Sequence, residues 1–264
     1  MSARLSNAPV YYALAQAVFN PVAAMEKYVG EIQDRLRQVG YTLFEPHQVT
    51  HLKIPASGQP FSPEVVQEMS WLMVKKDRTA GFILTNSAIV FHTTHYVTRQ
   101  AFIPELLRGL NAVHQVAQLE HVSRLGLRYL DAILPKKGET VEQYLVEGLR
   151  GIDLDCKKTR ALNEYVFATE TGPLVPQGTL VVRIYQAIGP LGYPADLQPR
   201  GLVQKKEFQI NESRPHAVID TDHFAEGQME LDFEAIEKQL FDLHGKIKQA
   251  FDKVVTDHAK SVWA

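Results

Sequence analysis

The middle of the chain, residues 121–134, is a long stretch in which polar and apolar side chains alternate. A period of two places successive side chains on opposite faces of a β-strand. One face of this strand would carry Arg124, Gly126 and Arg128, and the other would carry Leu125, Leu127 and Tyr129. Because one face is fully apolar, we expect the strand to lie at the centre of the fold. It would join the elements before it to those after it.

Two long segments have apolar residues at every third or fourth position, as amphipathic helices do. The first covers residues 98–118, and the second begins after Asp232. Each follows a series of strand-like segments. The sequence therefore predicts an α+β fold with antiparallel sheets packed by long amphipathic helices, in two similar halves. Residues 1–135 would form the N-terminal half and 140–264 the C-terminal half, packed together as one compact unit.

The same patterns place the remaining elements. Predicted strands cover residues 10–19, 41–54, 67–75, 80–85, 88–96, 160–171, 179–188, 202–211 and 216–224. Predicted shorter helices cover residues 23–39, 140–150 and a segment after Thr256. The helix at 140 has a capping box, because Gln143 follows Thr140 by three residues. Residues 55–63 and 189–201 are expected to be loops, because glycine and proline are frequent in them.

Charge and cysteine content limit the possible partners and compartment. The formal net charge of the 264 residues is −2, so nothing draws the whole chain to nucleic acid or to an anionic membrane. The single cysteine, Cys156, cannot form an internal disulfide, which fits a reducing cytoplasm. Asp153 and Asp155 beside it disfavour a reactive thiolate. The uncharged run 8–25 alternates like a buried strand and is too short and polar to span a bilayer. We therefore expect a cytoplasmic protein without a membrane partner.

Arg124 and Arg128 are the first candidates for a binding site. Four residues of strand separate them by roughly 13 Å, so they could line a groove but could not hold one carboxylate from adjacent positions. Gly126 between them leaves the backbone open to a ligand or to a crossing helix. The alternative is that each arginine pairs with an acid of a neighbouring strand, such as Glu164 or Glu170.

Histidine and aspartate residues on two other strands are, by residue type, candidate metal ligands. His92 and His95 would point to opposite faces of their strand, so they would not share a metal. His216, Asp220 and Asp222 share one strand face and precede His223, but residues two apart lie roughly 7 Å from each other. We therefore expect an exposed polar strand face there and no metal site. The candidate ligand-binding residues are Arg124, Arg128, Glu164, Asp220 and Asp222.

The common catalytic and cofactor-binding motifs are missing from the sequence. It has no CxxC pair, no HExxH, no GxSxG and no phosphate-binding glycine loop between a strand and a helix. We accordingly predict no catalytic residue and no cofactor. Four lysine doublets, at 75–76, 136–137, 157–158 and 205–206, are interpreted as solvated charges near strand ends or in connections. They would bind phosphate only if they converged on one face.

Four segments together resemble a known family. They are residues 5–10 (LSNAPV), 124–129 (RLGLRY), 218–222 (VIDTD) and the close of the chain from 250 to 263. In this order and spacing they resemble a sporadically distributed family of bacterial proteins of unknown function and of about this length. The resemblance covers nearly the whole chain and implies no catalytic residues. The patchy distribution implies an accessory gene, for example one of phage defence or of a toxin–antitoxin system.

Three functions are compatible with these observations. The leading hypothesis is a non-enzymatic cytoplasmic binding protein that presents a sheet face, or the cleft between its halves, to a protein partner. It would be an accessory component of a defence or toxin–antitoxin system. The second is a small-ligand-binding protein or an enzyme with a cleft at Arg124 and Arg128. The third is a nucleic-acid-binding protein that uses the lysine doublets. A homo-oligomer is compatible with all three.

Overall fold

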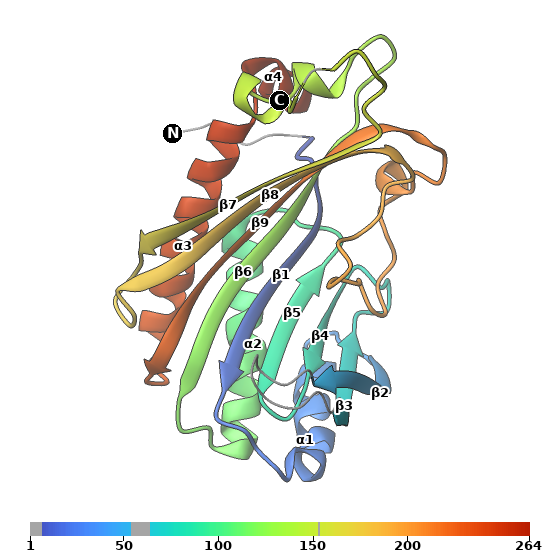
Figure 1. The fold of residues 1–264 in the computed structure, drawn as a ribbon. Coiled ribbons are helices and arrows are strands. Elements are labelled where there is room, and N and C mark those ends of the chain that lie inside the picture. Colours follow the sequence, from blue (N-terminus) through green and yellow to red (C-terminus); the bar gives the residue numbers. More distant parts are fainter. Residues whose placement is uncertain (1–6, 54–63, 153) are drawn as a thin grey trace.

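The computed structural model of the protein describes residues 7–53, 64–152 and 154–264. Within these residues, nine strands form one antiparallel sheet, in the order β2-β3-β4-β5-β1-β6-β9-β8-β7 (Figure 1). The strands are β1 (Val10–Phe19), β2 (Leu43–Lys53), β3 (Glu64–Val74), β4 (Ala80–Leu84), β5 (Ala88–Thr93), β6 (Val122–Ile133), β7 (Arg160–Glu170), β8 (Gln177–Gly189) and β9 (Arg214–Met229). The predicted loop 55–63 lies outside the described residues.

This sheet shows that the expected fold class is wrong. The sequence predicts antiparallel sheets in two similar halves, each packed by a long helix. The structure instead has one sheet, whose strands come from both sides of residue 135. Strand β6 makes the join, because it pairs antiparallel with β1 on one side and with β9 on the other. The two predicted halves therefore share their main structural element, and strands are the larger part of the fold.

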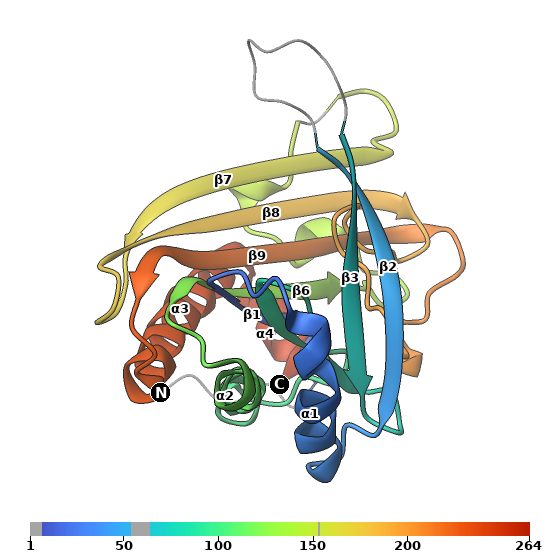
Figure 2. The ribbon, with the colours of Figure 1, turned by 90° about the horizontal axis from the view of Figure 1, so that it is seen from below.

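The long helices lie together on one face of the sheet, as Figure 2 shows. They are α1 (Met25–Gln38), α2 (Arg99–Ala117) and α3 (Phe233–Val254). Helix α3 packs on β9, β6 and β8, helix α2 packs on β5 and β1, and α1 lies against α2 and β3. A short helix, α4 (Asp257–Trp263), follows α3, and Trp263 closes the end of the core beside Phe251 and Tyr144. No helix of the described residues is long and apolar enough to cross a membrane.

The helix starts confirm the sequence signals at three positions. The side chain of Thr98 accepts a hydrogen bond from the backbone N–H of Ala101, and Asp232 and Thr256 cap α3 and α4 in the same way. Each cap satisfies an N–H group that the first helical turn leaves without a partner. The apolar stripe of α3 is buried as predicted, at Ile236, Leu240, Leu243, Ile247, Phe251 and Val254.

The central strand also has the predicted two faces. Leu125, Leu127 and Tyr129 are buried under the helices. Tyr129 packs edge-on against Tyr96, with ring centroids 5.1 Å apart. Arg124, Gly126 and Arg128 lie on the opposite face, here called the open face.

Two predicted elements are absent from the described structure. Residues 140–150 form two short 3-10 turns, Val141–Gln143 and Glu147–Leu149, instead of a helix. The predicted capping box of Thr140 and Gln143 is present, but Leu145 then forms a β-bridge with Val255. That bridge takes the backbone groups that a helix would use.

The predicted hairpin of residues 202–211 and 216–224 is also wrong, because only the second segment is a strand. Residues 190–208, here called the cover loop, cross the open face of the sheet instead. Val203 donates its N–H to the carbonyl of Arg78, and Thr94 donates its hydroxyl to the carbonyl of Val203 at 2.7 Å. The backbone of the loop is therefore satisfied by the β3–β4 turn and by the end of β5 rather than by a neighbouring strand.

A β-bulge in β1 helps to anchor the cover loop. The register with β6 shifts between Val10 and Tyr12, and Tyr11 and Tyr12 both pack in the small apolar cluster under the loop. The Tyr11 hydroxyl donates to the carbonyl of Gly192 at 2.9 Å. The rings of Tyr11 and Tyr12 both contact Tyr193. The bulge thus turns two neighbouring aromatic side chains toward the same loop.

Candidate functional site

A row of alternating charges crosses the open face from the edge strand β7 to the cover loop. Its members, in order, are Glu164, Arg183, Asp220, Arg128 and Asp196. Glu164 on β7 pairs with Arg183, its register partner on β8. Arg183 in turn lies 3.8 Å from Asp220 on β9. Each charge of the row therefore has a neighbour of opposite sign.

Arg128 is the most strongly held member of this row. Its Nε and Nη2 donate to the two carboxylate oxygens of Asp220, each at 2.7 Å. Its Nη1 and Nη2 also donate to Asp196, at 2.5 and 3.2 Å. Burial alone would lower the pKa of Arg128, but the two carboxylates raise it above its usual value. Arg128 therefore stays charged and ties the cover loop to the sheet.

Arg124 lies on the same face but has different partners. Its Nη1 donates to Glu226 at 2.8 Å, and the guanidinium lies 3.8 Å above the ring of Phe224. The guanidinium lies beside the backbone of Gly126, where an added Cβ would come within 3.7 Å of its Nη2. The alternative considered from the sequence, pairing of each arginine with an acid of a neighbouring strand, is thus observed. The acids are Glu226 and Asp220 rather than Glu164 or Glu170.

Asp222 sits directly across from Arg128 in the β6–β9 register. Burial raises the pKa of its carboxyl above the usual value, although Arg128 and Arg124 both oppose that rise. No hydrogen bond to its carboxylate is found within the described residues. The expectation of an exposed polar face on β9 is wrong, because Asp220 is fully buried and Asp222 is half-buried. The cause is the cover loop, which the sequence pattern of the strand could not reveal.

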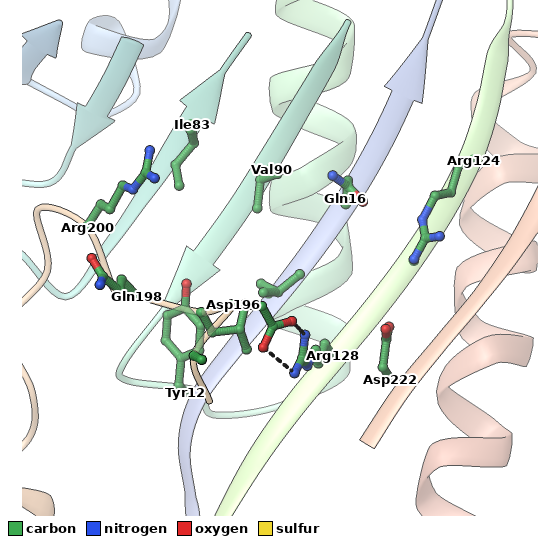
Figure 3. A pocket seen from close by; sticks show the side chains of 14 residues that line it. Tyr12, Gln16, Ile83, Val90, Arg124, Arg128, Asp196, Gln198, Arg200 and Asp222 are labelled. Atoms are coloured by element: carbon green, nitrogen blue, oxygen red, sulfur yellow. Dashed lines mark hydrogen bonds and ion pairs between the residues drawn. The ribbon is translucent and has the colours of Figure 1, made fainter. Parts of the chain in front are cut away.

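A cavity of about 400 Å³ lies between the open face and the cover loop. Its floor is a row of residues in cross-strand register, one from each of four neighbouring strands: Ile83, Val90, Gln16 and Gly126. Arg124, Arg128 and Asp222 stand at one end of the row, as Figure 3 shows. The structure thus brings together three of the five predicted site residues. Asp220 lies behind Arg128, and Glu164 lies on the outermost strand, away from the cavity lining.

Two polar residues of the cover loop line the other end of the cavity and were missed from the sequence. They are Gln198 and Arg200, which lie on the opposite side of Figure 3 from Arg124 and Asp222. Burial lowers the pKa of His92 to about 3, and the charge of Arg200 contributes to the same shift. The charge of Arg200 therefore acts on His92, whose side chain shares a hydrogen bond of 3.0 Å with that of Tyr12. The loop composition predicts no such role for a single arginine.

The histidines that are candidate metal ligands by residue type have other partners. His92 is buried beside Tyr12, and Nδ1 of His95 lies 3.0 Å from the hydroxyl of Thr94. His223 contacts Thr169 and the carbonyl of Leu243. Over residues 7–53, 64–152 and 154–264, no three His, Cys, Asp or Glu side chains are grouped so that they could hold a metal ion.

Three of the lysine doublets lie near strand ends, and the doublet at 205–206 lies in the cover loop, a connection between strands. Several of their members already have a partner. Lys158 donates to Glu142 at 3.3 Å, Lys205 lies 3.8 Å from Glu207, and Lys75 lies over the ring of Tyr41. Nucleic-acid binding through the doublets stays a prediction. Cys156 is a free, exposed thiol.

Comparison with known proteins does not add a relative. No protein-family model matches the chain, and no curated protein is significantly similar to it in sequence.

Proposed function

We propose that the protein binds a small organic ligand in the cavity under the cover loop, and that the ligand carries an acidic group at one end and a hydrogen-bond donor at the other. The observation that supports this most directly is the separation of two charged side chains, neither of which makes an ion pair within the described residues. Arg200 stands at one end and Asp222 at the other. Among the described residues, neither side chain makes an ion pair or a hydrogen bond with an oppositely charged group.

The other charges of the cavity are already neutralised. Arg128 is held by Asp220 and Asp196, and Arg124 is held by Glu226. A ligand carboxylate or phosphate would have to displace one of these acids to reach either arginine. Arg200 needs no such displacement. We therefore assign Arg128 to holding the site together and Arg200 to ligand binding.

The size and walls of the cavity fit a small molecule. Its volume of about 400 Å³ lies within the usual range for ligand sites. Polar and charged side chains form most of its lining, and apolar side chains such as Ile83 and Val90 form part of its floor. Four strand spacings separate β4 from β9, which is about 19 Å. An amino-acid derivative, a short peptide or a hydroxy acid phosphate could span a large part of that length.

A thermal-shift screen tests the proposal. The ligand set contains amino acids, dipeptides, hydroxy acids and sugar phosphates, together with matched compounds that lack either the acid or the donor. At least one bifunctional compound should raise the melting temperature more than both of its matched analogues. Affinity measured by calorimetry should fall about tenfold to a hundredfold in Arg200→Gln and in Asp222→Asn, as expected for the loss of one charge-assisted hydrogen bond.

Arg37→Gln is the matched control, because Arg37 pairs with Asp34 on the exposed surface of α1. It should leave the affinity unchanged. If no compound of the set raises the melting temperature, or if Arg200→Gln and Arg37→Gln bind equally well, the proposal is wrong.

A protein partner, the leading hypothesis from the sequence, remains a second proposal with separate support. The edge strand β7 exposes Leu162, Val166 and Phe167 to solvent, and exposed apolar edge strands are common docking sites for other chains. A role in defence or in a toxin–antitoxin system is supported by the sequence resemblance alone.

A further inference from the structure

The two edges of the sheet differ in how they are protected. Strand β2, at one edge, contains Pro46, which cannot donate a hydrogen bond to a further strand. Strand β7, at the other edge, runs without proline or lysine from Arg160 to Glu170. Its whole length pairs with β8 in unbroken register. Among the described residues, only β8 pairs with β7. The backbone N–H and C=O groups of every second residue of β7 therefore point outward and have no strand to pair with.

Strand β7 is also apolar on both faces. Four of its large apolar side chains are exposed, namely Leu162 (52%), Tyr165 (39%), Val166 (63%) and Phe167 (48%). Tyr165 and Phe167 stack on the helix side, with ring centroids 6.4 Å apart. Their register partners on β8, Val182 and Leu180, belong to the buried core. The core therefore reaches the edge strand and stops there with its last residues uncovered.

A regular apolar edge of this length is a template for strand pairing. The charges of β7 show which strand would fit. The basic residue Arg160 begins the strand, and the acidic residue Glu170 ends it. The third charge, Glu164, already pairs with Arg183. In an antiparallel pairing of β7 with a second β7, the first residue of each strand lies opposite the last residue of the other.

We propose that two copies of the protein associate through β7, with a two-fold axis at Tyr165. In this register Tyr165 faces its own copy, and Arg160 of each chain lies opposite Glu170 of the other. The interface is isologous, so each of these contacts occurs twice or lies on the axis. Two sheets then become one continuous sheet, with both open faces and both cavities on the same side.

Neighbouring registers fit less well. The open faces stay on the same side only if residues of equal parity pair, so the next choices are centred on Glu164 or Val166. A centre at Glu164 places that carboxylate against its own copy, and like charges directly opposite each other are destabilising. A centre at Val166 places Leu162 against Glu170 and leaves Arg160 beyond the end of the strand. Charge complementarity therefore selects the register centred on Tyr165.

Charge reversal tests the contact directly. By sedimentation, the wild-type chain should be a dimer at about 100 µM, where an interface with a micromolar dissociation constant is largely formed. Arg160→Glu and Glu170→Arg should each raise the dissociation constant at least about tenfold, because each creates two repulsive contacts. The double variant Arg160→Glu/Glu170→Arg should restore the dimer. Val97→Lys, which changes an exposed apolar residue away from β7, should have no effect.

A cysteine cross-link tests the register. In a Cys156→Ser background, Tyr165→Cys should form a disulfide-linked dimer on mild oxidation, whereas Leu162→Cys should not, because two copies of residue 162 lie far apart in this register. A wild-type chain that sediments as a monomer at this concentration overturns the proposal. So does a dimer that resists both charge reversals. Neither result bears on ligand binding in the cavity, which is measured separately with monomeric variants.

Discussion

Arg128 and Asp220 form two parallel hydrogen bonds of 2.7 Å between adjacent strands, in a part of the sheet where Asp220 is fully buried. The guanidinium and the carboxylate therefore satisfy each other's hydrogen-bonding groups at a buried position. Arg128 uses its remaining N–H groups to hold Asp196 of the cover loop. One arginine thus connects the sheet to the segment that closes the cavity.

The first prediction concerns the loss of this arginine. Arg128→Met should lower the free energy of unfolding by about 3 kcal/mol, because buried Asp220 then loses both hydrogen bonds and keeps only Arg183, 3.8 Å away, as a charged neighbour. The double variant Arg128→Met/Asp220→Leu should recover much of that loss, because apolar side chains then replace both charges. Urea denaturation measures both effects. Arg37→Met is the control, and removal of this exposed pair should cost less than about 1 kcal/mol. Equal losses in the single and double variants would contradict the argument.

The second prediction concerns pH. Burial raises the pKa of Asp131 from 3.8 to about 7. The folded protein therefore binds this proton more tightly than the unfolded chain does, and stability is lost as the pH rises from about 4 to about 7. Asp131→Asn removes the loss, so at pH 8 it should be more stable than the wild type by about 2–4 kcal/mol, and near pH 4 it should be similar to it.

The measurement is the urea midpoint of both proteins between pH 4 and pH 8. The wild-type curve should fall across this range relative to that of Asp131→Asn. Glu212→Gln, at an exposed position, should follow the wild type. Parallel curves for the wild type and Asp131→Asn would show that Asp131 does not titrate in this window.

The third prediction concerns the attachment of the cover loop. Tyr11→Phe removes the hydrogen bond to the carbonyl of Gly192 but keeps the buried ring. The expected cost is about 1 kcal/mol, and amide hydrogen exchange in residues 190–208 should become faster. Tyr185→Phe, a change of a partly buried tyrosine packed against the same cluster, is the control. If exchange in the loop is the same in all three proteins, Tyr11 does not anchor the loop.

The two faces of the central strand could be predicted from the sequence because they depend on neighbouring residues alone. A period of two places Arg124 and Arg128 on one face wherever the strand lies. The helix starts at Thr98 and Asp232 could be predicted for the same reason, since a capping side chain bonds within its own first turn. These features survive a change in the overall fold, and they were correct although the expected fold class was not.

The joining of the strands into one sheet could not be predicted in this way. Strand β6 pairs with β9, which follows it by a long segment of chain, and no local period encodes that pairing. The cavity depends on the same kind of information. Arg200 lies in a segment rich in glycine and proline, and its position is set by hydrogen bonds such as that from Arg78 to the carbonyl of Gly201. Charge on a loop residue alone does not show which face the residue will reach.

The last prediction concerns the contact between α2 and the sheet. A Cβ atom at Gly109 would lie only 2.5 Å from the ring of Phe82 and 3.0 Å from Ile89. Gly109→Ala should therefore destabilise the protein by about 1–2 kcal/mol, because overpacking costs more than the alanine gains in helix propensity. Gly30→Ala is the matched control on α1, where nothing lies within 4 Å of the added atom. It should stabilise the protein by about 0.5–1 kcal/mol. Chemical denaturation of the two variants measures the difference, and a shift in the same direction for both would mean that α2 lies farther from β4 than the structure shows.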